Sequence, residues 1–153
     1  MKKTTIDIQK GFSLIEILIV VTIISLLVSI AAFSYSSFIR QSRDAKRKTD
    51  IEQIRASIEM YKSFNNVYPT PDTTSPNNGM PFGTAGITDT STTYISKLPN
   101  DPRASSGYTY FYTTLSNNLD YTLCAYLESS GTATANSCGT SACTYCMGPY
   151  GEK

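Results

Sequence analysis

Two groups of residues in this chain have side chains that could do chemistry. Glu16 is the single charge in an apolar run that covers residues 12–33. A carboxylate at the centre of such a run costs about 2.5–3.5 kcal/mol on membrane-insertion scales, so it needs a compensating partner and indicates function. The second group is the cysteines Cys124, Cys138, Cys143 and Cys146. Four thiols could form two disulfides or bind a metal ion.

No combination of residues typical of an enzyme is found. The chain has no histidine, which excludes Ser–His–Asp and Cys–His catalytic arrangements and the usual metalloprotease sites. The sequence selects no pair of carboxylates for acid–base catalysis, and its glycines lack phosphate-binding spacing. We therefore expect a protein that is not an enzyme.

The apolar run has the length of a membrane span. Its 22 residues are close to the roughly 20 that a helix needs to cross the hydrocarbon core. The run is too long for the apolar core of a secretory signal, and no A-x-A-like cleavage site follows it. We expect the run to be kept in the mature protein as a transmembrane helix.

Residues 10–16, with the sequence Lys-Gly-Phe-Ser-Leu-Ile-Glu, resemble the processing site of type IV prepilins and type II secretion pseudopilins. The resemblance implies that residues 1–11 are a leader, that prepilin peptidase cuts between Gly11 and Phe12, and that Phe12 is then N-methylated. It also implies a structural subunit of a type IV pilus-like or pseudopilus fibre. The alternative is a monomeric membrane-anchored extracytoplasmic binding domain, in which the helix is only an anchor.

Cleavage would give Glu16 a possible counter-charge. It creates an α-ammonium group on Phe12, with a reference pKa of about 7.7–8.0, and in one helix this group lies about 6 Å from Glu16 along the axis. In the family the glutamate pairs instead with the N-terminus of a neighbouring subunit, so the resemblance implies that Glu16 sets the register of assembly. The remaining alternative is a carboxylate that reaches out to the lipid headgroups.

The resemblance further implies the partners and the location of the protein. The expected partners are prepilin peptidase, an inner-membrane assembly platform and other copies in a homo-oligomeric helical fibre. The chain would be a single-pass protein of the cytoplasmic (inner) membrane before assembly, and part of an extracytoplasmic or cell-surface fibre afterwards. The sequence leaves open whether this is a pilus, a secretion pseudopilus or a DNA-uptake filament, and whether the subunit is major or minor.

Segment 40–48 carries five cations against one anion. This charge conflicts with the expected placement of the segment outside the cytoplasm. The positive-inside rule alone would place the segment in the cytoplasm. We expect it outside, because the leader is basic too and the cysteines favour an oxidising exterior. Its cations could bind nucleic-acid phosphates, but no aromatic residues are interleaved with them. Lipid headgroups and subunit contacts are the expected partners, and no specific nucleic acid is expected.

One long helix must position these residues. No proline or glycine occurs between Phe12 and Asn66, which favours an uninterrupted helix. We expect its first half, residues 12–39, in the membrane or the fibre core. The second half, residues 40–64, has an apolar stripe typical of an amphipathic helix: Ile51, Ile54, Ile58 and Tyr61.

The second half of the helix also carries two charge pairs with i,i+4 spacing. They are Asp44 with Lys48 and Arg55 with Glu59, and we expect both on exposed faces.

Residues 65–153 are predicted to form a globular head. Residues 65–93 are rich in proline and glycine and indicate a long connecting loop. Strands are expected at 93–98, 108–114 and 121–127, with Tyr108, Tyr110 and Tyr112 sharing one face. Leu123, Ala125 and Leu127 are expected to face the helix. The predicted fold class is α+β, a long N-terminal helix packed on a small antiparallel sheet.

Two further motifs resemble the major pseudopilin branch, called pseudopilin G. They are Tyr61 with the stretch Tyr-Pro-Thr at 68–70, and Leu-Pro-Asn-Asp-Pro at 98–102. That branch holds calcium in a C-terminal loop rich in Asp and Gly, whereas no Asp follows Leu127 here. Calcium needs six to eight oxygen ligands, so we do not expect it, and Asp101 is predicted to be a turn residue.

The four cysteines occupy the place of that loop. We expect two disulfides, with three connectivities open, and Cys124 on a predicted strand suggests that one bridge ties the tail to the sheet. Cys143 and Cys146 form a C-x-x-C motif, but it lacks the strand-to-helix setting of a redox motif. A zinc site would usually bring a second such pair or histidines, and neither is present. No cofactor is expected.

Overall fold

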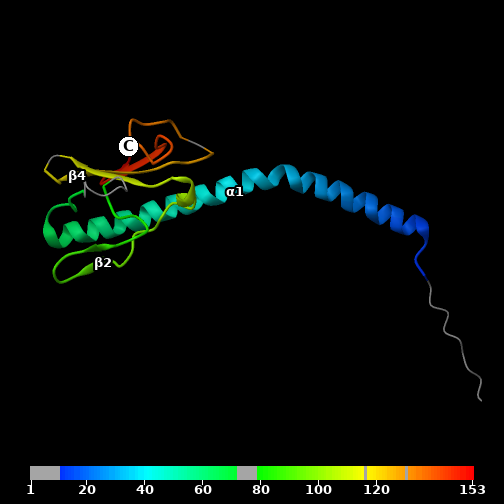
Figure 1. The fold of residues 1–153 in the computed structure, drawn as a ribbon, viewed down its shortest axis with the longest axis horizontal. Coiled ribbons are helices and arrows are strands. Elements are labelled where there is room, and N and C mark those ends of the chain that lie inside the picture. Colours follow the sequence, from blue (N-terminus) through cyan, green and yellow to red (C-terminus); the bar gives the residue numbers. More distant parts are fainter. Residues whose placement is uncertain (1–10, 72–78, 116, 130) are drawn as a thin grey trace, which may run out of the picture. The chain divides into compact units, whose positions relative to one another are not determined.

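The computed structural model describes residues 11–71, 79–115, 117–129 and 131–153. Most of the predicted leader, residues 1–10, and part of the predicted connecting loop, residues 72–78, lie outside these ranges. The chain divides into two compact units, Met1–Phe38 and Ile39–Lys153. One helix, α1 (Leu14–Asn65), contributes to both units and runs from blue to green in Figure 1.

The predicted helix is present and ends where the sequence changes. Asn66 follows the last helical residue with a φ of 61°, and its N–H donates to the carbonyl of Lys62 at 2.8 Å. Asparagine tolerates this left-handed conformation, which commonly ends helices. The chain then enters the proline-rich segment, which cannot continue a helix.

The head contains two antiparallel sheets. The larger has the strand order β3-β4-β5-β6, formed by Phe111–Leu115, Asp120–Ala125, Tyr145–Gly148 and Gly151–Glu152. The smaller pairs β1 (Ile87–Thr88) with β2 (Thr93–Ile95). The predicted α+β class, with a long helix followed by a small antiparallel sheet, is confirmed.

The predicted strands are present but shorter than expected. The strand predicted at 93–98 ends at Ile95, and the one predicted at 121–127 covers Asp120–Ala125. The strand predicted from 108 begins at Phe111, because Tyr108 forms only an isolated bridge with Gly139. Three short strands, β1, β5 and β6, were not predicted.

The helix stripe forms one side of the core. Ile51, Ile54 and Ile58 are fully buried, as predicted, whereas Tyr61 is partly buried. They belong to one apolar cluster with Tyr110, which directly precedes β3, and with side chains from the sheet that include Tyr112, Tyr121, Leu123 and Ala125. In Figure 1 the green half of α1 and strand β4 lie in the same part of the head.

Strand β4 is buried on both faces. Leu123 and Ala125 belong to the cluster that contains the helix stripe. Cys124, which points to the opposite face, lies in a second cluster with the three other cysteines. Phe111 and Tyr126 pack against this second cluster. The C-terminal loop therefore covers the face of β4 that the helix does not.

The two disulfides predicted from the sequence are present. Cys124 bonds to Cys146, which is its register partner in the β4–β5 pair, and Cys138 bonds to Cys143 within the loop. Cys143 and Cys146 therefore have different partners and do not form a C-x-x-C disulfide. The loop lies close to the chain beside it, because a Cβ at Gly139 would meet the carbonyl oxygen of Gly107.

The two bridges should differ in how much they stabilise the head. We expect Cys124→Ala/Cys146→Ala to lower the free energy of unfolding by about 3 kcal/mol and Cys138→Ala/Cys143→Ala by about 2 kcal/mol. The reason is that the bridges join residues 22 and 5 positions apart, and the longer loop loses more chain entropy when it is closed. Urea unfolding of the full chain in detergent micelles, followed by near-ultraviolet circular dichroism, measures both. A larger loss for the short bridge would contradict the expectation.

Candidate functional site

The predicted processing site precedes the helix. Gly11 and Phe12 lie before the first helical residue, Leu14, and both are exposed, Phe12 by 80%. A Cβ at Gly11 would meet no atom within 4 Å among the described residues. The fold of this chain therefore does not itself require glycine at position 11.

Glu16 lies in the first turn of α1. The backbone N–H of Ser13 donates to Oε2 of Glu16 at 3.4 Å, which is the backbone part of a capping box. Glu16 is also the only charged residue between Gly11 and Phe38. No side chain of this segment can therefore neutralise its carboxylate.

The helix around Glu16 has an apolar surface with nothing packed on it in the described chain. The large apolar side chains of residues 12–30 are all at least 47% exposed. An 18-residue window of this helix has a mean hydropathy of 2.8 and is long and apolar enough to cross a membrane. The hydroxyls of Thr22, Ser25 and Ser29 donate to carbonyls of the preceding turn at 2.7–2.8 Å. Their polar groups are thus satisfied within the helix, as an apolar environment requires.

A second group of charged residues lies within the head and is centred on Arg47. The Arg47 side chain is fully buried. It donates to Asp101 at 2.7 and 3.1 Å and to Asp44 and Glu128 at 2.9 Å each. One guanidinium thus joins the helix to two segments that lie 54 and 81 residues away in the sequence.

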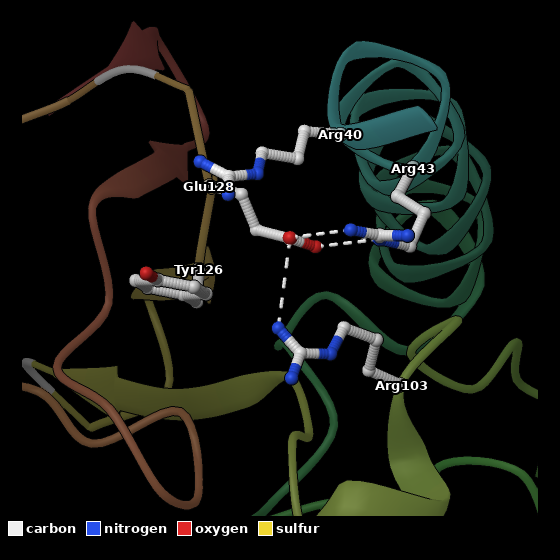
Figure 2. Close-up of a pocket in the computed structure, with 5 residues that line it drawn as sticks. All are labelled: Arg40, Arg43, Arg103, Tyr126 and Glu128. Atoms are coloured by element: carbon white, nitrogen blue, oxygen red, sulfur yellow. Dashed lines mark hydrogen bonds and ion pairs between the residues drawn. The ribbon is translucent and has the colours of Figure 1, made fainter. Parts of the chain in front are cut away.

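Two further arginines contact the carboxylate of Glu128. Arg43 binds its carboxylate with two hydrogen bonds of 2.7 and 2.6 Å, and Arg103 approaches it at 3.5 Å, as Figure 2 shows. We call the set of Arg43, Arg47, Arg103, Asp44, Asp101 and Glu128 the Arg47 cluster. It contains three positive and three negative side chains.

The Arg47 cluster keeps its members charged. Hydrogen bonds from Arg43 and then Arg47 lower the pKa of Glu128 to about 2, against the opposing effect of burial. Burial likewise opposes the charge of Arg47, but the hydrogen bond and attraction of Asp101, with those of Glu128 and Asp44, raise its pKa above the ordinary value. Partners of opposite charge outweigh the loss of water in both cases.

The predicted exposed ion pairs of the helix are wrong. Asp44 is buried and, besides Arg47, accepts the backbone N–H groups of Glu128 and Ser129 at 2.9 and 2.8 Å rather than pairing with Lys48. Pairing with buried partners is stronger than an exposed i,i+4 pair, which is worth only a few tenths of a kcal/mol.

The second of these predicted pairs is wrong for the same reason. Glu59 accepts the hydroxyls of Tyr68 and Tyr121. Arg55 pairs with Glu52 at 3.4 Å instead.

Asp101 has a role that sequence reasoning missed. It does make the predicted turn, since it accepts the N–H of Arg103 at 2.7 Å, but its carboxylate also binds Arg47. A signal was present in the sequence. Arg47 lies four residues before Ile51, on the same helical stripe as the buried isoleucines. A charged residue on a core-facing stripe indicates a buried partner elsewhere.

The basic segment 40–48 does not present a free row of cations. Arg43 and Arg47 belong to the Arg47 cluster, Lys46 pairs with Asp50 at 3.3 Å, and the Lys48 ammonium lies 5.4 Å from the centre of the Tyr145 ring. Within the described ranges, no group of three or more His, Cys, Asp or Glu residues is arranged to hold a metal ion.

Comparisons with known proteins bear on the start of the chain and on its family. Residues 7–32 match the family described as prokaryotic N-terminal methylation motif. The chain is 33% identical to type II secretion system core protein G of Vibrio cholerae over 102 residues, 61% of this chain and 65% of that protein. It is 30% identical to the protein of the same name in Escherichia coli K12 over 105 residues, 63% of this chain and 68% of that protein. The chain belongs to the type II secretion system core protein G family.

Membership of the core protein G family confirms the resemblance to the pseudopilin branch. The chain is also 42% identical to the type IV major fimbrial protein FimA of Dichelobacter nodosus over 53 residues, 35% of this chain and 34% of that protein. The alignments span 65% of the Vibrio cholerae core protein G and 44% of the Pseudomonas aeruginosa one. More than a third of each of these two relatives is therefore unaligned. No solved structure gives a significant match.

Removal of the central guanidinium should destabilise the head. We expect Arg47→Met to lower the free energy of unfolding by about 3–5 kcal/mol, because it leaves buried carboxylates without their counter-charge. The control is Arg55→Met on the same helix, which removes a partly exposed pair with Glu52 and a hydrogen bond to the carbonyl of Pro149, and should cost about 1 kcal/mol. Urea titration of both variants in detergent micelles tests this, and equal losses would contradict it.

Glu128 should make the stability of the head depend on pH. Its pKa is lowered from 4.5 to about 2 in the fold, so its contribution is complete above about pH 5 and is lost as the pH falls towards 2. We expect a loss of about 3 kcal/mol at most. In Glu128→Gln this part of the pH dependence should disappear. Urea unfolding of both proteins between pH 6 and about pH 2 measures the difference, and identical pH profiles would refute the assignment.

Proposed function

We propose that this protein is a structural subunit of a type II secretion pseudopilus or a related type IV pilus-like fibre, cut between Gly11 and Phe12, methylated at Phe12 and assembled through α1. One observation carries the proposal. Glu16 is the only charge in an exposed apolar helix that directly follows the methylation motif. A membrane anchor alone needs no charge at this position, since an uncharged glutamine could make the same capping contact with Ser13.

The start of the chain supports processing. The bond between Gly11 and Phe12 is exposed and lies before the helix, so a peptidase can reach it without unwinding α1. The glycine has open space around its Cα, which means that packing within the chain does not explain its presence. Recognition by prepilin peptidase in the membrane does explain it.

The apolar surface of α1 supports assembly. Burial of apolar surface contributes about 25 cal/mol per Å², so the first half of the helix needs cover whenever it leaves the bilayer. Other copies of the same helix provide that cover in a fibre. The ammonium of Phe12 in a neighbouring copy would neutralise Glu16, and each buried charge would then have its partner.

The disulfides support an extracytoplasmic head. Segment 40–48 belongs to the same compact unit as the disulfides, and its Arg47 binds Asp101 inside that unit. Both must therefore lie on the same side of the membrane. Since disulfides persist in oxidising compartments, this side is the exterior, despite the count of positive charges.

The remaining parts of the proposal follow from this placement. The chain is a single-pass protein of the cytoplasmic (inner) membrane until an inner-membrane platform adds it to the fibre. Its role involves neither catalysis nor a cofactor, and it requires no nucleic acid. Its partners are prepilin peptidase, the platform and other copies of the chain.

A single substitution separates a fibre subunit from a membrane anchor. We expect Glu16→Gln to be cleaved after residue 11 like the native chain but to be recovered in sheared fibres at a small fraction of the native amount, because the charge that pairs with Phe12 is gone. The measurements are the intact mass of the membrane protein, which reports loss of residues 1–11 and methylation, and immunoblots of the sheared fraction.

The control is Glu52→Gln, which removes an exposed carboxylate from the head half of the same helix. It should leave both cleavage and fibre yield unchanged. If Glu16→Gln assembled at the native level, the assembly role would be wrong. A native chain recovered only in membranes, with its leader intact, would instead favour the anchored binding domain.

A further inference from the structure

A polar pocket lies where the head half of α1 begins. It has a volume of about 470 Å³ and is lined by Arg40, Arg43, Arg103, Tyr126 and Glu128. In Figure 2, Arg40 and Arg43 extend from α1, whereas Arg103 points towards Glu128 from another segment of the chain. All five residues belong to the unit Ile39–Lys153. The lining carries three positive charges and one negative charge.

The charges of the pocket are not balanced by the chain. The Arg47 cluster is neutral by itself, with three arginines and three carboxylates. Arg40 is an additional cation, exposed to solvent, and its side chain makes no hydrogen bond or ion pair within the described ranges. Arg103 contacts Glu128 only at 3.5 Å and is 37% exposed. Two guanidinium groups at the pocket therefore have donors to spare.

The position of the pocket along the helix indicates where an anion would come from. Arg40 lies two residues after Phe38 and five after Tyr35, and both aromatic side chains are 67% exposed. Exposed aromatic residues at the end of an apolar span are typical of the membrane–water interface. Cations that follow them meet the phosphates of the headgroups.

We propose that Arg40 and Arg103 bind the phosphate diester of an anionic phospholipid headgroup. The two free oxygens of a phosphate diester can each accept one of the two parallel N–H donors of a guanidinium, so the pair binds with two hydrogen bonds. Glu128 does not repel the lipid strongly, because Arg43 and Arg47 already hold its carboxylate. The contact with Glu128 holds Arg103 in the wall of the pocket that Arg40 also lines.

This site attaches the head of the unassembled subunit to anionic lipid of its membrane. It needs the membrane span but not the fibre, so it can fail while the assembly function stands. It is also distinct from a general attraction of basic residues to a membrane, because it assigns binding to Arg40 and Arg103 and not to Lys46, which is exposed on the same helix.

The test uses the full, processed chain, one copy per nanodisc, in phosphatidylcholine with a minor fraction of phosphatidylglycerol. Spin-labelled forms of both lipids report how strongly each associates with the protein. We expect Arg40→Gln and Arg103→Gln each to lower the preference for phosphatidylglycerol by about threefold or more, since a cation near the surface contributes about 1 kcal/mol. The matched control, Lys46→Gln, should lower it by less than about twofold.

Arg40 is exposed and outside the cluster, so Arg40→Gln should fold normally, which near-ultraviolet circular dichroism verifies. An unchanged preference in this variant would overturn the proposal. An equal decrease in Lys46→Gln would also overturn it, because binding would then follow net charge alone. The last measurement uses inorganic phosphate as the ligand. If inorganic phosphate binds the native protein but not Arg40→Gln, and the native protein shows no preference for phosphatidylglycerol over phosphatidylcholine, the pocket is a site for free phosphate and the lipid assignment is wrong.

Discussion

The head depends on the burial of one guanidinium. Arg47 is inaccessible to solvent, and a charge in that position costs several kcal/mol unless its surroundings supply both opposite charge and hydrogen bonds. Here Asp101 and Glu128, from two distant segments, and Asp44, from the same helix, supply both. A shift of the helix by one turn against the sheet would bury Arg47 without partners. The cluster therefore fixes the register of the helix, which apolar contacts among isoleucines alone specify only weakly.

Strand β4 links this cluster to the rest of the head. It lies between the helix stripe and the cysteine loop, and residue 128 follows it by three positions. The side of β4 away from the helix is covered by a loop with little regular structure, which gains little from backbone hydrogen bonds. The bridge from Cys124 to Cys146 holds that cover in place across the sheet. The Arg47 cluster thus ties the helix to the segment that follows β4, and the disulfide from Cys124 ties the loop to the opposite face of β4.

The sequence predicted the parts of this structure that depend on local patterns. The long helix followed from the absence of proline and glycine, and its buried stripe followed from the spacing of Ile51, Ile54 and Ile58. Strands β3 and β4 were recognisable from their aromatic and β-branched residues. The contacts of Arg47 were not predicted, because they join residues more than 50 positions apart. The disulfide pairing was left open among three connectivities, with the expected bridge from Cys124 to the tail present. Strands β5 and β6 were not predicted, since no local pattern encodes them.

The two units of the chain meet the same constraint in different ways. A charge removed from water requires an opposite charge nearby. In the head, every carboxylate of the Arg47 cluster finds its arginine within the chain. In the unit that precedes it, Glu16 has no cationic side chain at all, because no other residue from Gly11 to Phe38 is charged. An ammonium group at Phe12 would be the nearest remedy, and only cleavage creates it. If that group pairs with Glu16 of another copy, the charge that makes one subunit incomplete also determines where the next subunit binds.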